Sequence, residues 1–507
     1  MARESRQACK GKPVKGVCVS VARVLERELS AEARCDVECA AVECDSRKVS
    51  PGCAFAAIPG VENDGAAFAA EAVASGAKCI IAEKPLPRAG VPVFQVRDAR
   101  RAWALLACAV AGDPSRAMRV WGVTGTNGKT TTAWTLAEMF RRSAPCGLVT
   151  TVETSWPGFS AESAHTTPDA GELQEMFSSM RASGAKRAVM EVSSHSTCQR
   201  RIDGTQFAGG IFTNLSEDHL DYHKTMESYF EAKTAFFRQV AELSPGAPAV
   251  VCAGGGWSGR MEREVRALGL ECVTCGFAPD CAVRGENLEI SGRGNKFDIS
   301  AGGKSVRVEC PLAGRYNAEN VLCAAAAALC EGAALGEIAE SIHALRPRWG
   351  RLEPVETKSP AAVFVDFAHT PDALEKVLAA AREFTRGKIH IVFGAGGDRD
   401  RAKRPLMGAA CAEGADRLVV TSDNPRSENP ADIIADIVRG IPEGTPFAVE
   451  PDRAAAIALA ISSARAGDTV IIAGKGHERT QTFAGGTIPF DDRAAAMAAA
   501  ERQAPEV

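Results

Sequence analysis

Features that mark a secreted or membrane-spanning chain are missing from this sequence. Residues 1–7 do not resemble a secretory signal, and no apolar run reaches the roughly 18 residues of a membrane-spanning helix. The 18 cysteines show no cysteine–histidine cluster with the spacing of a zinc site. We therefore expect a cytoplasmic protein with reduced thiols, most of them buried as small hydrophobic side chains.

A surplus of basic residues is also missing. The formal net charge is −4 and the isoelectric point is near 6.2, so nucleic acid is not an expected partner. Apolar residues make up 46% and charged residues 24% of the chain, which is ordinary for a globular protein. A length of 507 residues exceeds one ordinary domain and suggests about three.

Short apolar segments alternate with helical patterns along most of the chain, which is typical of an α/β protein with mostly parallel sheets. The clearest strand candidates are residues 79–82, 119–123, 188–191, 210–213, 249–252, 363–367, 389–393, 417–421 and 469–473. Gly112-Asp113-Pro114 and the segment 346–350 have the glycine and proline content of linkers. They predict three domains, 1–113, 114–346 and 347–507.

Polar clusters follow the predicted strands. They are residues 124–131, 192–195, 214–219, 368–372, 394–398, 423–426 and 475–478. Ligands of open parallel sheets bind outside the carboxyl ends of the strands. The clusters fall in the second and third predicted domains, so we expect a site in a cleft between these two.

A glycine-rich loop lies between a predicted strand and a predicted helix in residues 120–132. Its glycines allow backbone N–H groups to face phosphate oxygens, and the helix N-terminus adds positive potential. Lys129 would reach the terminal phosphates and Thr130 would contact Mg²⁺. Val123 stands where the strict pattern has glycine, so this is a variant phosphate loop. The predicted ATP-binding residues here are Thr124, Gly125, Thr126, Asn127, Gly128, Lys129 and Thr130.

In its motifs the sequence resembles the Mur ligase family nearly from end to end. These motifs are Asp45-Ser46-Arg47, the phosphate loop, Thr166-Thr167-Pro168, residues 191–195, residues 213–223, Ala232-Lys233, residues 316–320, residues 366–371, residues 396–400, residues 403–405, residues 423–426 and residues 474–478. The resemblance implies a central phosphate-loop domain with a mostly parallel sheet. It also implies an N-terminal α/β domain that binds a uridine-diphosphate substrate and a C-terminal Rossmann-like domain.

The same resemblance implies the activity. ATP phosphorylates a carboxylate, an amine attacks the acyl phosphate, and an amide forms in cytoplasmic peptidoglycan precursor synthesis. The acceptor would be UDP-N-acetylmuramoyl-L-alanyl-D-glutamate and the amine meso-2,6-diaminopimelate. Such chemistry needs cations and positioned donors more than a strong nucleophile. A ligase that adds lysine or ornithine and a folylpolyglutamate synthetase-like ligase stay open as alternatives. Outside this class, a nucleotide switch and an inactive scaffold are the competing interpretations.

Four residues would carry the chemistry by resemblance: Lys129, Glu191, His219 and Lys233. Mg²⁺ would be held by Thr130, Glu191, His219 and a carbamate that CO₂ forms on Lys233. That reaction needs a neutral amine, which burial near other cations would provide by lowering the lysine pKa. Without the resemblance, we would interpret His219 as a core histidine or a helix cap near Asp218, and Lys233 as a solvated helix lysine.

The substrate residues are also assigned by resemblance. The muramoyl-dipeptide substrate would contact Ser46, Thr166, Thr167, Ser193, Gln199 and Arg201, while Asn317, Asp366 and His369 would lie near the nucleotide. The incoming amino acid would contact Arg399, Asp423, Asn424, Pro425, Arg426, Gly474 and Glu478. Diaminopimelate carries a second carboxylate that suits the guanidinium of Arg426. Alternatively, Arg426 pairs with Glu428 or caps the following helix. Only small-molecule partners and a monomer are expected.

Overall fold

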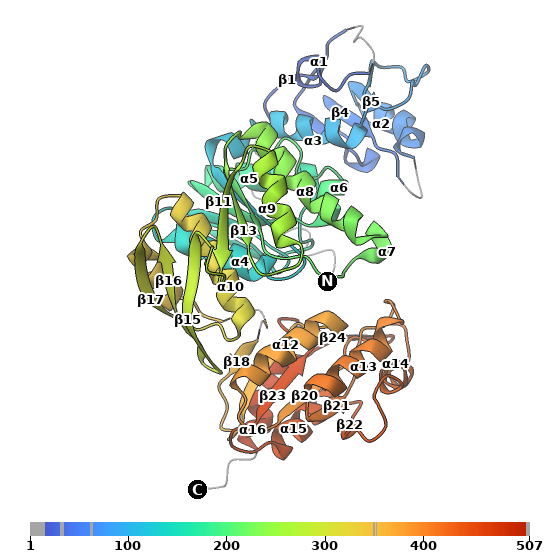
Figure 1. Ribbon diagram of the computed structural model, residues 1–507. Coiled ribbons are helices and arrows are strands. Elements are labelled where there is room, and N and C mark those ends of the chain that lie inside the picture. Colours follow the sequence, from blue (N-terminus) through green and yellow to red (C-terminus); the bar gives the residue numbers. More distant parts are fainter. Residues whose placement is uncertain (1–15, 31–34, 61–63, 348–349, 351, 503–507) are drawn as a thin grey trace. The chain divides into compact units, whose positions relative to one another are not determined.

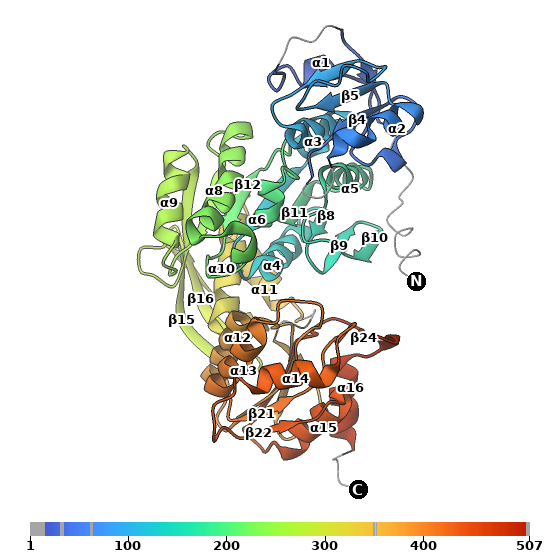
Figure 2. The same cartoon turned by 90° about the vertical axis from the view of Figure 1, so that its right-hand side faces the viewer.

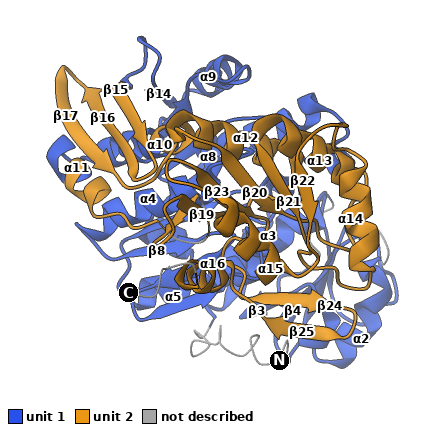
Figure 3. Cartoon of the chain, turned by 90° about the horizontal axis from the view of Figure 1, so that it is seen from below, with its two compact units in different colours: residues 1–284, 320–338 blue, residues 285–319, 339–507 orange. Residues whose placement is uncertain are grey.

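The computed structural model describes residues 16–30, 35–60, 64–347, 350 and 352–502. The chain forms two compact units (Figure 3). Unit 1 comprises residues 1–284 and 320–338, and unit 2 comprises residues 285–319 and 339–507. The chain passes between them within strand β15 (Val283–Ser291), helix α10 (Arg315–Cys330) and helix α11 (Leu335–His343).

The main sheet of unit 1 is parallel over six neighbouring strands in the order β8-β11-β7-β12-β13-β14. Their bounds are β7 (Arg119–Thr124), β8 (Cys146–Val149), β11 (Arg187–Glu191), β12 (Gly209–Phe212), β13 (Pro248–Cys252) and β14 (Glu271–Gly276). An antiparallel hairpin of β9 (Glu153–Trp156) and β10 (Phe159–Glu162) extends the sheet beyond β8. The strand predictions over 119–123, 188–191, 210–213 and 249–252 are therefore confirmed to within one or two residues.

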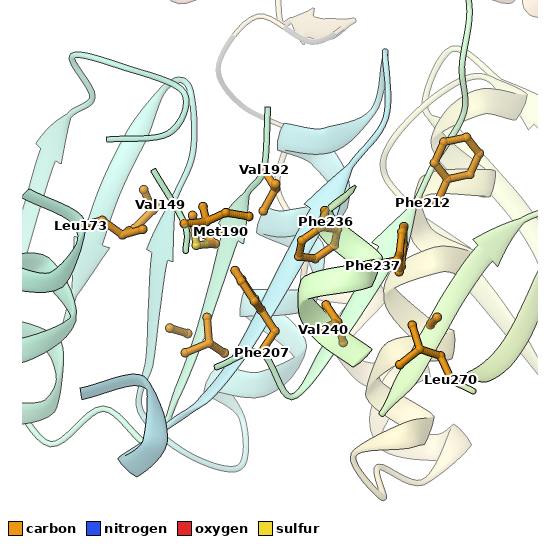
Figure 4. Close-up of a cluster of buried hydrophobic side chains, with 14 of the residues drawn as sticks. Val149, Leu173, Met190, Val192, Phe207, Phe212, Phe236, Phe237, Val240 and Leu270 are labelled. Carbon is orange, nitrogen blue, oxygen red and sulfur yellow. The ribbon is translucent and has the colours of Figure 1, made fainter. Parts of the chain in front are cut away.

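Helices cover both faces of this sheet. Helices α5 (Ala170–Ala182), α8 (Met226–Leu243) and α9 (Ser258–Ala267) bury one apolar face. Figure 4 shows Phe207, Phe236 and Phe237 in this core. Helix α4 (Lys129–Arg141) packs on the other side of β8 and β11 from α5 (Figure 2). A Cβ on Gly122 of β7 would lie 2.5 Å from the Phe236 ring, so a small residue lets α8 approach the sheet.

A smaller sheet lies nearer the N-terminus of unit 1. Its four parallel strands run in the order β3 (Ala41–Glu43), β4 (Cys53–Ala57), β5 (Cys79–Ala82) and β6 (Val93–Gln95). Around them are β1 (Val19–Ser20), α1 (Val21–Val24), β2 (Glu38–Cys39), α2 (Ala69–Ala74) and α3 (Ala99–Val110). Arg101 of α3 forms ion pairs with Asp203, which lies shortly before β12, and with Glu242 of α8. These pairs link the two sheets of unit 1.

Unit 2 contains a six-stranded sheet in the order β18-β19-β23-β20-β21-β22, parallel except for β18. The bounds are β18 (Glu353–Val355), β19 (Ala362–Asp366), β20 (Ile389–Phe393), β21 (Arg417–Val420), β22 (Phe447–Val449) and β23 (Thr469–Ala473). Unit 2 also contains most of β15, a hairpin of β16 (Gly294–Ala301) and β17 (Lys304–Cys310), and another of β24 (Thr480–Phe483) and β25 (Gly486–Pro489).

Alternating side chains give this sheet two apolar faces. Ile389, Ile391 and Phe393 of β20 face one core, whereas Val392 faces the other. The first core includes α12 (Pro371–Phe384), α13 (Lys403–Gly414) and α14 (Pro430–Val438); the second includes α15 (Arg453–Ser463) and α16 (Asp492–Glu501) (Figure 1). The sheet is thus covered on both faces, as expected for parallel strands.

The mixed α/β class with a mostly parallel central sheet is confirmed, while the domain boundaries at 113 and 346 stay a prediction. Buried cysteines such as Cys79 and Cys146 are protonated thiols, because burial raises the pKa of each to about 12. Within the described part of the chain, no helix is long and apolar enough to span a bilayer.

Candidate active site

The phosphate loop follows β7 and requires its two central glycines. Gly125 has φ +147°, and a Cβ there would lie 1.9 Å from the Thr213 hydroxyl. Gly128 has φ +83°, and a Cβ there would lie 2.1 Å from the Asn320 side-chain oxygen. Helix α4 begins at Lys129 without a side-chain cap, as expected for a helix N-terminus that receives an anion.

Two lysine side chains meet at this loop. The Lys129 ammonium donates hydrogen bonds to the carbonyl oxygens of Gly125 (3.0 Å) and Thr126 (2.8 Å). Lys233 of α8 donates to the same Gly125 carbonyl at 2.9 Å, and its nitrogen lies 4.3 Å from the centre of the Tyr229 ring. Burial, with the charge of Lys129 as a second cause, lowers the pKa of Lys233 well below its usual value. The solvated-lysine alternative is therefore wrong.

Glu191, at the end of β11, accepts three hydrogen bonds beside the loop. The Thr130 hydroxyl donates to its carboxylate at 2.7 Å, and the backbone N–H and hydroxyl of Thr151 donate at 2.8 and 3.1 Å. Glu191 and Thr130 are both buried. A carboxylate and a hydroxyl are the oxygen donors that Mg²⁺ prefers, so these residues fit a magnesium ion next to bound phosphates.

Five of the six predicted dipeptide-binding residues connect to Glu191. Thr166 accepts from Thr151 at 3.1 Å, and the Thr167 hydroxyl donates to the Glu191 carbonyl at 2.9 Å and to Ser193 at 3.3 Å. Arg201 donates to the Thr167 carbonyl at 2.8 Å and to the Gln199 side chain at 2.7 Å.

The sixth, Ser46, lies in the smaller sheet's domain and donates to Glu71 at 2.9 Å. Among the described residues, no hydrogen bond joins Ser46 directly to the other five.

His219 precedes the short helix α7 (Leu220–His223) with a left-handed backbone, φ +54°. Its side chain is 47% exposed and lies 3.3 Å from the Asp218 carboxylate. A core histidine is therefore wrong. The ring also contacts His195, whose ring centre is 5.0 Å away, and Tyr229. Since the Tyr229 hydroxyl is 3.3 Å from Thr126, His219 borders the phosphate loop through one aromatic residue.

The predicted nucleotide residues of unit 2 are held by local backbone contacts. Asn317 donates to the Ala313 carbonyl at 2.8 Å. Asp366 is buried and accepts from the backbone N–H groups of Leu352 and Ala368, so it fixes the loop after β19. His369 contacts the Phe367 carbonyl through Nδ1 at 2.8 Å.

The predicted amino-acid residues gather at the carboxyl ends of β20, β21 and β23 in unit 2. Asn424 donates to Glu478 at 2.7 Å, and the buried Lys475 ammonium donates to Asn424 at 3.1 Å and to Glu478 at 3.0 Å. A Cβ on Gly474 would lie 2.5 Å from the Asp423 carboxylate. Pro425 is buried and Arg399 is exposed.

Arg426 neither pairs with Glu428 nor caps the following helix. Glu428 pairs with the buried Arg404 at 2.7 Å, and this contact is the main cause that lowers the pKa of Glu428 to about 2. Asn429 caps α14. Arg426 instead donates to the Gly397 carbonyl at 2.6 Å, from a residue with φ +54°.

Sequence reasoning missed Thr151, Tyr229, Asn320 and Lys475. Tyr229 precedes Lys233 by four residues, so helical periodicity could have placed both on one face of α8. Lys475 lies between two predicted residues, Gly474 and Glu478. Thr151 carried no signal, because the strand before it was not predicted.

Comparison with known protein families agrees with this arrangement. Residues 38–110 match the Mur ligase family catalytic domain, residues 123–328 the Mur ligase middle domain, and residues 350–476 the Mur ligase glutamate ligase domain. Together with the relatives below, these matches show that the chain belongs to the Mur ligase family.

Within the family, the chain is similar to UDP-N-acetylmuramoyl-L-alanyl-D-glutamate–2,6-diaminopimelate ligases. The protein of that name from Parasynechococcus marenigrum is 42% identical over 90% of this chain and 94% of its own length. The one from Gloeobacter violaceus is 42% identical over 92% and 95%. A solved structure of such a ligase superposes with a TM-score of 0.72 at 32% identity, over 96% of this chain and 99% of that chain. MurF from Acinetobacter baumannii, at 18% identity and a TM-score of 0.61 over 91% of this chain and 96% of its own, shares the fold.

Proposed function

We propose that this chain is an ATP-dependent ligase that adds meso-2,6-diaminopimelate to UDP-N-acetylmuramoyl-L-alanyl-D-glutamate, releasing ADP and phosphate. The similarity to ligases of that name over nine-tenths of the chain supports the substrates. The observation that carries the chemistry is the junction of Thr130, Glu191 and the loop lysine Lys129 at the ends of adjacent parallel strands.

The chain's own groups account for the demands of acyl phosphate formation. The loop N–H groups and Lys129 would hold phosphate oxygens and offset their charge, which is the main requirement of phosphoryl transfer. The Thr124 hydroxyl is buried and has no hydrogen-bond partner among the described residues, so it can bind a loop ligand. Thr130 and Glu191 would hold Mg²⁺, which neutralises phosphate charge when bound.

Lys233 would carry a carbamate. Its neutral amine attacks CO₂, a C–N bond forms, and one proton leaves to solvent, which turns a buried amine into a carboxylate. The change would place a negative charge close to the Lys129 ammonium, because both side chains contact the Gly125 carbonyl. It would also add an oxygen donor beside the magnesium residues. A depressed lysine pKa supports this proposal, since only the free amine reacts.

The unit 2 cluster around Asn424 and Arg426 would select the amine. Asp423 and Glu478 can hold the ammonium groups of diaminopimelate, while Arg426 suits its second carboxylate. His219 would complete the magnesium surroundings. We place the reaction in the cytoplasm, where the peptidoglycan precursor is made, and the monomer stays a prediction.

An end-point assay tests the proposal directly. The protein is incubated with the UDP-muramoyl-dipeptide, ATP and one of diaminopimelate, lysine or ornithine, and tripeptide and phosphate are measured. We expect equal amounts of both products with diaminopimelate, and little with the other amines. Lys129→Ala should abolish turnover while folding normally. ATP hydrolysis without amide formation for every amine would contradict the proposed activity.

A further inference from the structure

Three buried cysteines of unit 1 lie together at the carboxyl end of the main sheet. Cys252 ends β13, Cys275 lies near the end of β14, and the two are register partners on these neighbouring parallel strands. Cys323 comes from α10, and its sulfur lies 3.5 Å from that of Cys275. The three sulfur atoms all lie within 4.8 Å of one another.

These distances suit a single ion. Three thiolates bound at about 2.3 Å to one metal in a plane stand about 4.0 Å apart. The Cys275 and Cys323 sulfur atoms are 3.5 Å apart, and no pair in the group is separated by more than 4.8 Å. Side chains therefore need to move little to bind. In the described part of the chain, no aspartate, glutamate or histidine joins the group. Cys272 has Cys-x-x-Cys spacing with Cys275 but is not a member of the group either.

The donor set selects the kind of metal. Thiolates bind soft ions such as Cu(I) and zinc, whereas magnesium and calcium require oxygen ligands. Structural zinc takes four ligands in nearly every case, and this group offers three. We propose that Cys252, Cys275 and Cys323 form a three-thiolate site for one soft metal ion, and that Cu(I) is the ion it binds. The displaced thiol protons go to solvent, and no electron is transferred.

A disulfide is the competing use of these thiols. Cys275 and Cys323 are close enough to react after a small movement, but both are fully buried, and such a bond needs an oxidant. It would also leave Cys252 without a role. Three converging sulfur atoms favour a metal ion over a two-cysteine bond.

The site adjoins the phosphate loop through one helix. Asn320 of α10 accepts from Thr132 at 3.3 Å and faces Gly128, and Cys323 follows it by three residues. A bound ion would tie α10 to β13 and β14. Because the ion binds the folded state in preference to the unfolded chain, it should raise the unfolding temperature of unit 1.

The test uses the reduced full-length protein under anaerobic conditions, titrated with Cu(I) in competition with a chromophoric Cu(I) chelator. We expect one tightly bound Cu(I) per chain and at least 100-fold weaker binding in Cys275→Ala and Cys323→Ala. Cu(I) should raise the unfolding temperature of the wild type but not that of these two variants. Cys146→Ala removes an equally buried thiol from β8 of the same sheet and should bind as the wild type does.

Thermal unfolding without metal shows whether each variant folds. X-ray absorption on the Cu(I)-loaded wild type gives a measurement that needs no variant, and three sulfur scatterers at about 2.3 Å are expected. Equal binding by wild type, Cys275→Ala and Cys323→Ala would overturn the site. Tighter binding of Zn²⁺ than of Cu(I) would overturn the choice of ion. A Cys275–Cys323 disulfide that forms in air while Cu(I) fails to bind would assign the thiols to redox chemistry instead.

Discussion

Lys233 is the residue whose chemical state matters most for the proposed mechanism. Its amine shares the Gly125 carbonyl with Lys129 and is buried, so a neutral form is favoured. We predict that Lys233→Ala loses activity by about 100-fold or more, the scale of losing one positioned electrostatic group. Formate or acetate should restore part of the rate by supplying a carboxylate.

An exposed lysine of the β16–β17 hairpin provides the control, and Lys304→Ala should keep full activity. The measurements are initial rates of phosphate release, with intact-protein mass for the carbamate. Full activity of Lys233→Ala would remove the carbamate from the mechanism.

We predict that Arg426 determines which amine is used. A charge-assisted hydrogen bond contributes about 1.5–3 kcal/mol, so Arg426→Ala should lower kcat/KM for diaminopimelate by roughly ten- to a few-hundred-fold. Lysine lacks the second carboxylate and should be affected far less. Arg417→Ala, an exposed arginine at the start of β21, is the matched control. Equal losses with both amines would assign Arg426 to holding the Gly397 loop.

At the scale of elements, two glycines allow the effect of backbone strain to be measured separately from the effect of a steric clash in the phosphate loop. Gly128 and Gly158 have nearly equal φ values, +83° and +82°, but no described atom lies within 4 Å of a Cβ on Gly158. Alanine at either position should lower the free energy of unfolding by about 1 kcal/mol, because a residue with a Cβ is strained in the left-handed conformation. Only Gly128→Ala also meets Asn320, and we predict a rise of at least tenfold in KM for ATP.

Chemical denaturation and ATP kinetics on both alanine variants make this comparison. If Gly158→Ala raised the KM for ATP as much as Gly128→Ala does, a general loss of stability would explain both.

Strand positions could be predicted from sequence, and side-chain environments could not. Short apolar runs such as 389–393 and 469–473 end at glycine or polar residues, and both match strands residue for residue. The local composition of the chain is therefore enough to predict where these strands begin and end. The burial of Lys233 depends on α8 packing beside a loop about 100 residues earlier, which no local pattern records. The same holds for Cys252, Cys275 and Cys323, which meet only because β13, β14 and α10 do.

At the scale of the whole molecule, an acidic cluster makes stability depend on pH. Burial is the main cause that raises the pKa of Glu43 to about 7; the charge of Lys48 opposes this shift, and the charges of Glu175 and Asp169 add to it. The folded state therefore holds a proton that the unfolded chain releases near pH 4.5. Stability should fall as pH rises from about 4.5 to about 7.

Glu43→Gln should remove part of this dependence and stabilise the protein by about 2 kcal/mol at pH 8, with no gain at pH 4.5. Glu162→Gln, an exposed glutamate of the β9–β10 hairpin, should change neither value. Urea unfolding at the two pH values gives the comparison. A gain for Glu43→Gln that is equal at both pH values would exclude titration as its cause.

The three passages of the chain between the units lie inside β15, α10 and α11. Neither unit therefore corresponds to one uninterrupted stretch of codons. A single protease cut at one passage divides the linear chain into two fragments, but at least one unit then contains segments of both, so packing within that unit should keep the nicked protein associated. Gene fusion or exchange at a simple junction cannot transfer either unit by itself. The two must be inherited, translated and replaced together.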